Sequence, residues 1–299
     1  MHDGRMNEAP AEDPYQVRWG EHAQHLVDAA SENAQWYASV AAHLVNPQDR
    51  LAIDVGCGGA GMAAALAGVL SGGRVLAVDG DQEVLDAARA NLSRTGVPVD
   101  FVRADMDGDL SDVAEALGAP ADLAWASASV HHAGDQQRAV DKLAALLAPG
   151  GRLALAEGGL PLRSLPWDLG VGQPGLEQRL HAAQERWFVQ MREHLPGSVR
   201  MPYGWTQALR RAGLTTAYTR SWLQETPTPL STQDRHRVVH ELAHRVERLR
   251  PAGLLEPDDL SAWDRLLDES DPDWLGNRED LYRLTASSVH IGTKPERAG

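Results

Sequence analysis

Short apolar runs alternate with helical patterns between residue 50 and about residue 157 of this 299-residue chain. The runs are nearly continuous in hydrophobic residues, as strands buried on both faces of a sheet are, while the segments between them repeat apolar residues at helical spacing. This alternation predicts a parallel sheet with helices on both faces. In chain order the runs are LAIDV, MAAALAGVL, RVLAV, EVLDAARANL, VDFV, VAEALG, DLAWA, AVDKLAALL and RLALAE.

A polar tail and a helical pattern precede the first of these strands. Residues 1–13 lack an apolar pattern, so we expect them to be disordered. From Trp19 to Leu44 apolar residues recur at helical spacing. This pattern predicts a long amphipathic helix with at most one break.

Beyond Glu157 the regular alternation stops at a stretch rich in glycine and proline. The later patterns predict helices over 176–194 and 202–212, a strand at TTAYTRSWL and a closing strand at TASSVHIGT. The long segment between these strands, residues 226–280, predicts one helix with an apolar stripe and a second helix that begins at Pro257. We interpret both insertions as helical cap material over the carboxyl edge of the sheet, where ligands of open α/β sheets bind.

Composition limits the partners that suit this chain. The formal net charge of -14 repels phosphate backbones and disfavours a nucleic-acid partner. Cys57 is the single cysteine, which excludes an intramolecular disulfide and a cysteine-rich zinc site. The first residues lack the apolar core of a signal peptide and no run approaches the roughly 20 apolar residues of a membrane span, so we expect a soluble cytoplasmic protein without a membrane partner. Lys142 and Lys294 are the only lysines, a bias toward arginine from which no function follows.

The most informative run is LAIDVGCGGAGMAAALA, in which a strand that ends at Asp54 is followed by a glycine turn and a helix. Gly56, Gly58 and Gly59 let the backbone turn tightly and approach a ligand closely, which a Cβ would prevent. Similar turns occur in dinucleotide and phosphate sites. A tight turn without any ligand is the alternative that this run alone leaves open.

Acidic residues at the next two strand ends narrow the choice of ligand. Asp79 ends the second strand about twenty residues beyond the turn, where a carboxylate can accept both hydroxyls of a ribose. The third strand ends in FVRADMDG, so Asp105 could accept an adenine amino group and Met106 could lie against the ring. Three consecutive strand ends thus offer complementary groups for one adenosine-containing ligand.

Over about residues 50–157, these runs resemble the class I S-adenosylmethionine-dependent methyltransferases. Five motifs stand in the order of that family, which is far more specific than any single motif. They are DVGCGGAG, AVDGD, RADMDG, DLAWASASVHH and LAPGGRLALAE. One departure is Ala60, followed by Gly61, where the family often has a third glycine; this departure leaves the shape of the turn open.

The resemblance implies a Rossmann-like fold with seven mostly parallel strands, the last of them antiparallel, and a site for S-adenosylmethionine. It implies that Asp54 and the Gly56–Gly59 backbone border the methionine part, that Asp79 borders the ribose, and that Asp105 and Met106 border the adenine. The complete set of residues that we predict to bind the cofactor is Asp54, Gly56, Cys57, Gly58, Gly59, Asp79, Gly80, Asp105, Met106 and Ser127.

A dinucleotide-dependent oxidoreductase is the nearest rival interpretation, because it uses a similar turn and a similar acidic residue. Its pyrophosphate favours the spacing G-x-G-x-x-G, whereas the glycines of this chain are closer together. Cys57 could serve as a nucleophile, but a small residue beside the cofactor is the favoured role. Methyl transfer needs no covalent enzyme intermediate.

Methyl transfer depends on alignment of the acceptor and, for an alcohol, a phenol or a protonated amine, on removal of a proton. His131 and His132 follow the fourth strand, close to where the family places its acceptor, so either is a candidate general base or substrate partner. The alternative is that they pack against the loop or cap it. A metal site with Asp135 is disfavoured because adjacent histidines project in different directions and no further ligands stand near them, so we predict no metal.

Aromatic and arginine side chains in the segments expected to cover the cofactor are candidate substrate contacts. Arginine can bind an acidic group bidentately, and Trp or Tyr can stack on an aromatic group. Each of these side chains also has a structural interpretation, as ordinary packing. The candidates are Tyr15, Trp19, Arg163, Trp167, Tyr203 and Trp205.

The run DRHRVVHELAHRVERLR is the one basic stretch of this acidic chain. An RNA-binding face and a homodimer contact are two interpretations of it. Glu241 and Glu247 interrupt its charge and its apolar stripe indicates a side that faces a core, so a solvated face of a cap helix is favoured.

We therefore predict an enzyme of small-molecule biosynthesis that transfers a methyl group from S-adenosylmethionine to oxygen or nitrogen of a small molecule or short peptide and releases S-adenosylhomocysteine. Carbon methylation stays open. We predict a tail and helical lid over residues 1–45 and a cofactor-binding core over residues 46–158. Residues 159–299 are predicted to supply cap helices and the remaining strands of the same domain, and to form the substrate pocket. A methyltransferase-like enzyme with non-methylating chemistry and a non-catalytic cofactor-binding protein are the alternatives from other classes.

Overall fold

The structure is a computed structural model that describes residues 13–296. Backbone contacts divide the described chain into two compact units. The sheet unit consists of Arg18–Leu162, Pro196–Glu225 and residues 284–296, and the helical unit consists of residues 13–17, Arg163–Leu195 and Thr226–Arg283. The predicted disordered tail lies outside the described residues, apart from Asp13.

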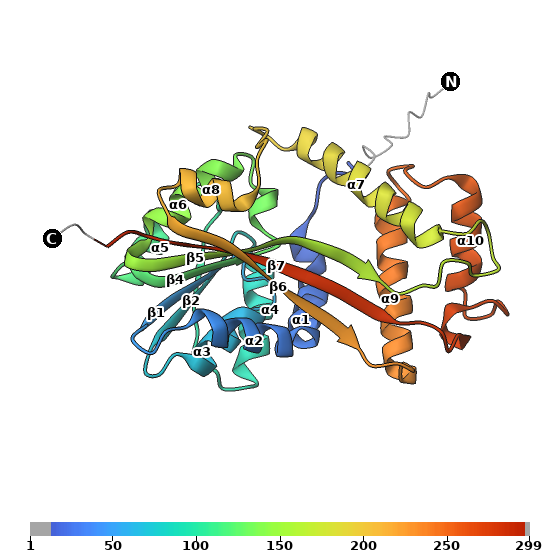
Figure 1. The fold of residues 1–299 in the computed structure, drawn as a ribbon, viewed down its shortest axis with the longest axis horizontal. Coiled ribbons are helices and arrows are strands. Elements are labelled where there is room, and N and C mark those ends of the chain that lie inside the picture. The colour runs from blue at the N-terminus through green and yellow to red at the C-terminus, as the bar shows by residue number, and fades with distance from the viewer. Residues whose placement is uncertain (1–12, 297–299) are drawn as a thin grey trace, which may run out of the picture. The chain divides into compact units, whose positions relative to one another are not determined.

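A seven-stranded sheet runs through the sheet unit, in the order β3-β2-β1-β4-β5-β7-β6 (Figure 1). The pairs β2–β3, β1–β2, β1–β4 and β4–β5 are parallel, which confirms the predicted parallel sheet. The chain moves outward from β1 to β3 and then returns to β4 on the other side of β1, which creates the point where ligands of such sheets bind. The strands are β1 (Leu51–Val55), β2 (Arg74–Asp79), β3 (Asp100–Arg103), β4 (Ala121–Ser127), β5 (Leu147–Arg163), β6 (Thr215–Thr226) and β7 (Arg283–Thr293).

The last strand runs against both of its neighbours. Contacts between β5 and β7 join Glu157 to His290 and Leu160 to Thr285, so residue numbers fall on one strand as they rise on the other. The side-chain contacts between β6 and β7, among them Thr219 with His290, follow the same rule. β7 is therefore antiparallel, as the family resemblance implies.

Helices cover both faces of this sheet. Ile53 and Val55 of β1 enter the core on one face and Ala52 enters the core on the other, because successive side chains of a strand point in opposite directions. One face carries α5 (Ser111–Leu117), α6 (Gln136–Ala145) and α8 (Trp205–Arg211), and the other carries α2 (Ala34–Leu44), α3 (Gly61–Val69) and α4 (Gln82–Ser93) (Figure 1).

The segment before the sheet is helical, as predicted, and has a break. The 3-10 turn η1 (Trp19–His22) leads into α1 (Ala23–Glu32), and α2 begins two residues later. At the break the Asn33 side-chain amide donates to the carbonyl oxygen of Ala29 at 2.8 Å. The backbone N–H of Asn33 donates to the same oxygen at 3.0 Å, so Asn33 closes the end of α1 with both its main-chain and its side-chain donor.

β5 continues past its predicted end at Glu157 to Arg163, so the glycine- and proline-rich run that predicts a loop is partly a strand. Gly159 has a φ of +129°, and a Cβ at this position would clash with the carbonyl oxygen of Ala286 on β7. Glycine permits the close approach of the two strands. A pattern based on apolar side chains does not detect a strand of this kind.

The helical unit has its own hydrophobic core, formed by α7 (Leu176–His194), α9 (Thr232–Leu249) and α10 (Pro257–Leu267) with the short turn η3 (Leu275–Asn277). The predicted helix over 176–194 and the helix that begins at Pro257 are confirmed. Val238, Leu242 and Val246 of α9 are buried in this core, so the apolar stripe of the basic run packs internally. Within residues 13–296, no helix combines the length and the apolar character needed to span a membrane.

The backbone of α1 packs directly against the turn that follows β1. A Cβ on Gly59 would lie 2.7 Å from the Cα of Val27 and 2.8 Å from the Cβ of Ala30, and closer still to the carbonyl oxygen of Leu26. These neighbours are mainly backbone atoms of a helix, which cannot rotate away. Only glycine permits this contact.

We predict that Gly59→Ala displaces α1 and lowers the free energy of unfolding by about 1–3 kcal/mol, the usual effect of overpacking a filled site. Gly68→Ala in α3 is the matched control, because a Cβ there meets nothing within 4 Å. It should raise stability by about 0.4–1 kcal/mol. Urea denaturation followed by circular dichroism measures both; equal stability of the two variants would contradict the packing argument.

Candidate functional site

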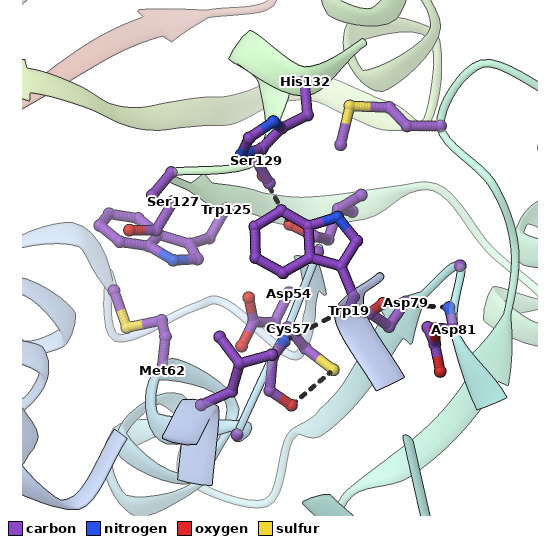
Figure 2. A pocket seen from close by; sticks show the side chains of 18 of the residues that line it. Trp19, Asp54, Cys57, Met62, Asp79, Asp81, Trp125, Ser127, Ser129 and His132 are labelled. Carbon is purple, nitrogen blue, oxygen red and sulfur yellow. Dashed lines mark hydrogen bonds between the residues drawn. The ribbon is translucent and has the colours of Figure 1, made fainter. Parts of the chain in front are cut away.

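A cavity of about 590 Å³ lies in the sheet unit, at the carboxyl ends of β1, β2 and β4 and beside the turn that follows β3 (Figure 2). All ten predicted cofactor-binding residues line it, although they come from four separate segments. Trp19 and His132, predicted on other grounds, line it too. The ten are Asp54, Gly56, Cys57, Gly58, Gly59, Asp79, Gly80, Asp105, Met106 and Ser127.

The turn between β1 and α3 forms the floor of this cavity. Gly56 and Gly58 have positive φ angles of 66° and 50°, a region that glycine enters without steric cost. A Cβ on Gly56 would lie 2.5 Å from the Cβ of Ser129, so glycine also permits the loop after β4 to approach. Ala60, where the family often has a third glycine, has a φ of 58°, in the left-handed region that glycine enters most readily.

Asp54 is buried beneath the turn and accepts a hydrogen bond from the backbone N–H of Ala63 at 2.9 Å. Burial raises its pKa to about 7, the hydrogen bond from Ala63 opposes this shift, and the charge of Asp79 adds to it. Near neutral pH, Asp54 thus lies close to the midpoint of its titration. A cation bound beside it would favour the ionised form.

Asp79 joins the end of β2 to the glycine turn. Its carboxylate accepts hydrogen bonds from the backbone N–H of Gly58 at 3.1 Å and from that of Asp81 at 3.2 Å. Burial raises the pKa of Asp79, and these hydrogen bonds act in the opposite direction. Asp79 therefore holds the two strand ends together and also faces the cavity (Figure 2).

Trp19 brings the N-terminal segment to the cavity. The N–H of Gly20 donates to Asp81 at 3.0 Å, and the other oxygen of that carboxylate caps the first turn of α4. The Trp19 ring contacts the His132 ring edge-on, with centroids 4.9 Å apart (Figure 2). The predicted substrate contact Trp19 is thus placed beside the predicted base His132.

The two adjacent histidines of the turn η2 (Val130–His132) have different environments. His132 lines the cavity, whereas His131 does not. The Nδ1 atom of His131 lies 2.6 Å from a carboxylate oxygen of Glu157, and the other oxygen of Glu157 accepts the backbone N–H groups of Ser129 and Val130 at 3.1 and 2.9 Å. His131 and Glu157 therefore hold the loop after β4, and His132 is presented to the cavity.

The thiol of Cys57 is buried next to two carboxylates. Burial raises the pKa of this thiol, and the charges of Asp54 and Asp79 raise it further. A thiol that keeps its proton is a poor nucleophile. This environment favours the interpretation of Cys57 as a small residue in the cavity wall.

The other predicted substrate contacts are not brought to this cavity. Tyr15, Arg163 and Trp167 belong to the helical unit. Tyr15 stacks on His194 with ring centroids 4.9 Å apart, and Arg163 pairs with the buried Glu177. The side chain of Trp167 is exposed. Tyr203 and Trp205 lie in the sheet unit and pack against the core beside α6, where the Tyr203 hydroxyl donates to Gln137 at 3.0 Å. The interpretation of these five residues as substrate contacts stays a prediction.

Several residues of this site were not among the predicted site residues, although Trp125 and Glu157 lie within two of the quoted motifs. Tyr37 of α2 and Trp125 of β4 line the cavity, and burial raises the pKa of Tyr37, with a contribution from Asp54. Glu157 and Lys142 do not line the cavity, but Glu157 accepts the N–H of Val130 and Lys142 donates to the carbonyl oxygen of Met106. The acidic end of the run LALAE is the one signal that could have pointed to Glu157. Among residues 13–296, no group of three or more histidine, cysteine or acidic side chains has the arrangement of a metal site.

Comparisons with known proteins match residues 53–155 to the family described as "Methyltransferase domain". A trans-aconitate 2-methyltransferase of Delftia acidovorans is 30% identical over 130 residues, which are 42% of this chain and 44% of that protein. The chain thus matches less than half the length of this curated relative.

Two solved structures have a similar fold. A chain of the complex between the Haloferax volcanii Trm112 methyltransferase activator and a methyltransferase has a TM-score of 0.51 at 17% identity, over 94% of this chain and 100% of that chain. Phosphoethanolamine N-methyltransferase 2 of Haemonchus contortus, solved with S-adenosyl-L-methionine, has a TM-score of 0.49 at 13% identity, over 94% of this chain and 61% of that chain. At such identity the first of these similarities shows the fold alone.

The sheet order, the helices on both faces and the cavity at the strand ends define a Rossmann-like α/β protein of the methyltransferase type. Residues 53–155 belong to the methyltransferase domain family, and the partial match to a curated methyltransferase agrees with this assignment. The family resemblance of the five sequence motifs is thereby confirmed.

The raised pKa of Asp54 predicts how ligand binding depends on pH. If the amino group of S-adenosylhomocysteine pairs with ionised Asp54, binding below pH 7 has to remove a proton, which costs about 1.4 kcal/mol per pH unit. We expect the Kd for S-adenosylhomocysteine, measured by calorimetry, to fall by up to about tenfold per unit from pH 5 to pH 7 and then to level off.

Asp54→Asn should bind more weakly and lose this pH dependence, because the amide does not titrate. Asp105→Asn, which removes another carboxylate of the cavity lining, is the matched control, and its Kd should keep the slope of the wild type. A slope that persists in Asp54→Asn would assign the titration to another group.

Proposed function

We propose that this protein transfers the methyl group of S-adenosylmethionine to an oxygen or nitrogen atom of a small molecule or short peptide and releases S-adenosylhomocysteine. The observation that carries the proposal is the convergence of ten motif residues on one cavity beside His132. The activity of the whole protein is a proposal because the matched segment covers only part of the known relative.

The residues present fit the cofactor. A cavity of about 590 Å³ has the size of sites that enclose ligands of this kind. Asp79 and Asp105 supply carboxylates for hydroxyl and amino groups, and Asp54 supplies one beside which an ammonium group is stabilised. When bound, the sulfonium of the cofactor supplies a methyl group that is already electrophilic.

His132 is the residue that we propose as the proton acceptor. An alcohol, phenol or ammonium group has to lose a proton as its oxygen or nitrogen attacks, and an imidazole can take that proton at one of its ring nitrogens near neutral pH. His131 is less suited, because its Nδ1 atom is engaged by Glu157 and its ring does not line the cavity. Trp19, in contact with the His132 ring, would orient the imidazole and exclude water.

The lining of the cavity favours an uncharged or cationic acceptor. Five aspartates line it, and no lysine or arginine does so among the described residues. The ionised aspartates would repel an anionic acceptor. The relative from Delftia acidovorans is named for trans-aconitate, which carries carboxylates, so we propose that this chain acts on a different class of acceptor. Nucleic acid, with its phosphate backbone, is disfavoured for the same reason.

Calorimetric titration with S-adenosylmethionine, S-adenosylhomocysteine and the nicotinamide dinucleotides tests the cofactor. We expect the two sulfur ligands alone to bind. Asp79→Ala should weaken their binding about 100-fold, because two hydrogen bonds to a charged group are lost. Binding of a dinucleotide without any response to the sulfur ligands would overturn the proposal.

His132→Ala tests the proton acceptor. Its affinity for S-adenosylhomocysteine should match that of the wild type, while turnover with an identified acceptor should fall about 100-fold or more. His131→Ala is the neighbouring control and should lose less turnover. Cofactor binding without methyl transfer to any acceptor would support a non-catalytic protein, and turnover without S-adenosylhomocysteine would support non-methylating chemistry.

Three small aromatic probes of matched size test the acceptor class. We expect benzylamine and para-cresol to bind to the protein saturated with S-adenosylhomocysteine at least about tenfold more tightly than phenylacetate, because of the charge of the cavity. Ligand-observed NMR measures the three affinities. Phenylacetate or trans-aconitate binding as tightly as benzylamine and para-cresol would contradict this assignment.

A further inference from the structure

One lysine holds the turn that follows β3. The Nζ atom of Lys142, on α6, lies 3.0, 2.8 and 2.6 Å from the carbonyl oxygens of Met106, Asp107 and Gly108. An ammonium group has three N–H donors that point in different directions, so one lysine can serve three carbonyl oxygens that converge on one point. A neutral side chain would leave these three dipoles facing one another.

The turn held in this way carries the residues that the motifs assign to adenine. Asp105 and Met106 line the cavity, and Lys142 does not. The turn is closed by the N–H of Gly108, which donates to the carbonyl oxygen of Asp105 at 3.0 Å, and by the N–H of Asp107, which donates to the Asp105 carboxylate at 2.9 Å. Because Lys142 contacts the main chain of this turn and does not line the cavity, it orients Asp105 and Met106 without being a ligand contact itself.

The same turn is attached to the segment after the histidines. Both carboxylate oxygens of Asp107 accept the backbone N–H of Gly134, at 3.1 and 2.9 Å. Lys142 binds the main-chain carbonyl of Asp107 and thereby restrains this residue as well. One ammonium group therefore connects the adenine side of the cavity with the segment that follows His132.

We propose that Lys142 is a positioning residue for the adenine half of the cofactor. The proposal rests on the proposed function, because it takes the cavity to be the cofactor site. The free energy of ordering the turn is provided in the folded protein by the Lys142 contacts, so the ligand does not have to provide it on binding. Without them, Asp105 and Met106 sample other positions and the adenine is held less tightly.

The only other lysine of the chain offers a matched control. The Nζ atom of Lys294 lies 3.2, 3.3 and 2.8 Å from the carbonyl oxygens of Ala144, Ala145 and Leu147. This contact has the same chemistry, but it lies at the start of β5 and none of its carbonyl groups belongs to a residue that lines the cavity. Loss of Lys294 should therefore affect stability without affecting the ligand.

The experiment compares Lys142→Met and Lys294→Met with the wild type, using S-adenosylhomocysteine and adenosine as calorimetric ligands. We expect Lys142→Met to raise the Kd of both ligands about tenfold, equivalent to ~1.4 kcal/mol, and Lys294→Met to leave both within about twofold of the wild type. The melting temperatures of the two variants should fall to a similar extent, which separates positioning from a general loss of stability.

An unchanged affinity in Lys142→Met, or an equal loss in Lys294→Met, would overturn the proposal. Failure of the proposed function is a different result, since the wild type itself would then bind no S-adenosylhomocysteine. Should Lys142→Met not fold, Lys142→Arg replaces the ammonium by a planar guanidinium that keeps the charge. It should weaken both ligands about threefold or more, and full affinity in this variant would also overturn the proposal.

Discussion

The turn between β1 and α3 is the part of the structure on which the site depends, and two hydrogen bonds to the neighbouring strand hold it. The N–H of Cys57 donates to the carbonyl oxygen of Val78 at 2.9 Å, and the N–H of Gly58 donates to the carboxylate of Asp79. These bonds bring the floor and one wall of the cavity together before any ligand binds. The helix α1 packs on Gly59 of the same turn, so the N-terminal segment is attached directly to a part of the chain that lines the cavity.

Much of the cavity lining could be predicted from sequence, because the topology of the sheet determines which residues meet there. Asp54 lies near the end of β1, Asp79 ends β2 and Asp105 follows β3, and parallel strands place their carboxyl ends at one edge of the sheet. Knowledge of the strand order is then enough to bring distant residues together. The glycine turn adds a local signal, because a left-handed backbone conformation favours glycine. Ala60 adopts this conformation too, so the signal is not strict.

The supporting contacts could not be predicted in the same way. In the sequence, Lys142 cannot be distinguished from any other polar residue of an amphipathic helix. Its partners are backbone carbonyl groups, which every residue has. The aromatic candidates could not be sorted from the sequence for another reason, because the same side chains fill cores and bind ligands. Trp19 lines the cavity while Tyr203 packs beside α6, and no sequence feature separates the two cases. The strand after Glu157 was missed because a glycine replaces the apolar side chain by which strands are recognised.

Trp19 has a consequence for the timing of the reaction cycle. Its ring lines the cavity and contacts His132, while the N–H of the next residue, Gly20, donates to Asp81. If the cavity holds the proposed cofactor, this ring would shield the transferred methyl group from water and would have to move before the product could leave. Enzymes of this design often turn over at the rate at which product leaves. In the proposed reaction, the turnover rate would then be limited by movement of the Trp19 side chain rather than by methyl transfer itself.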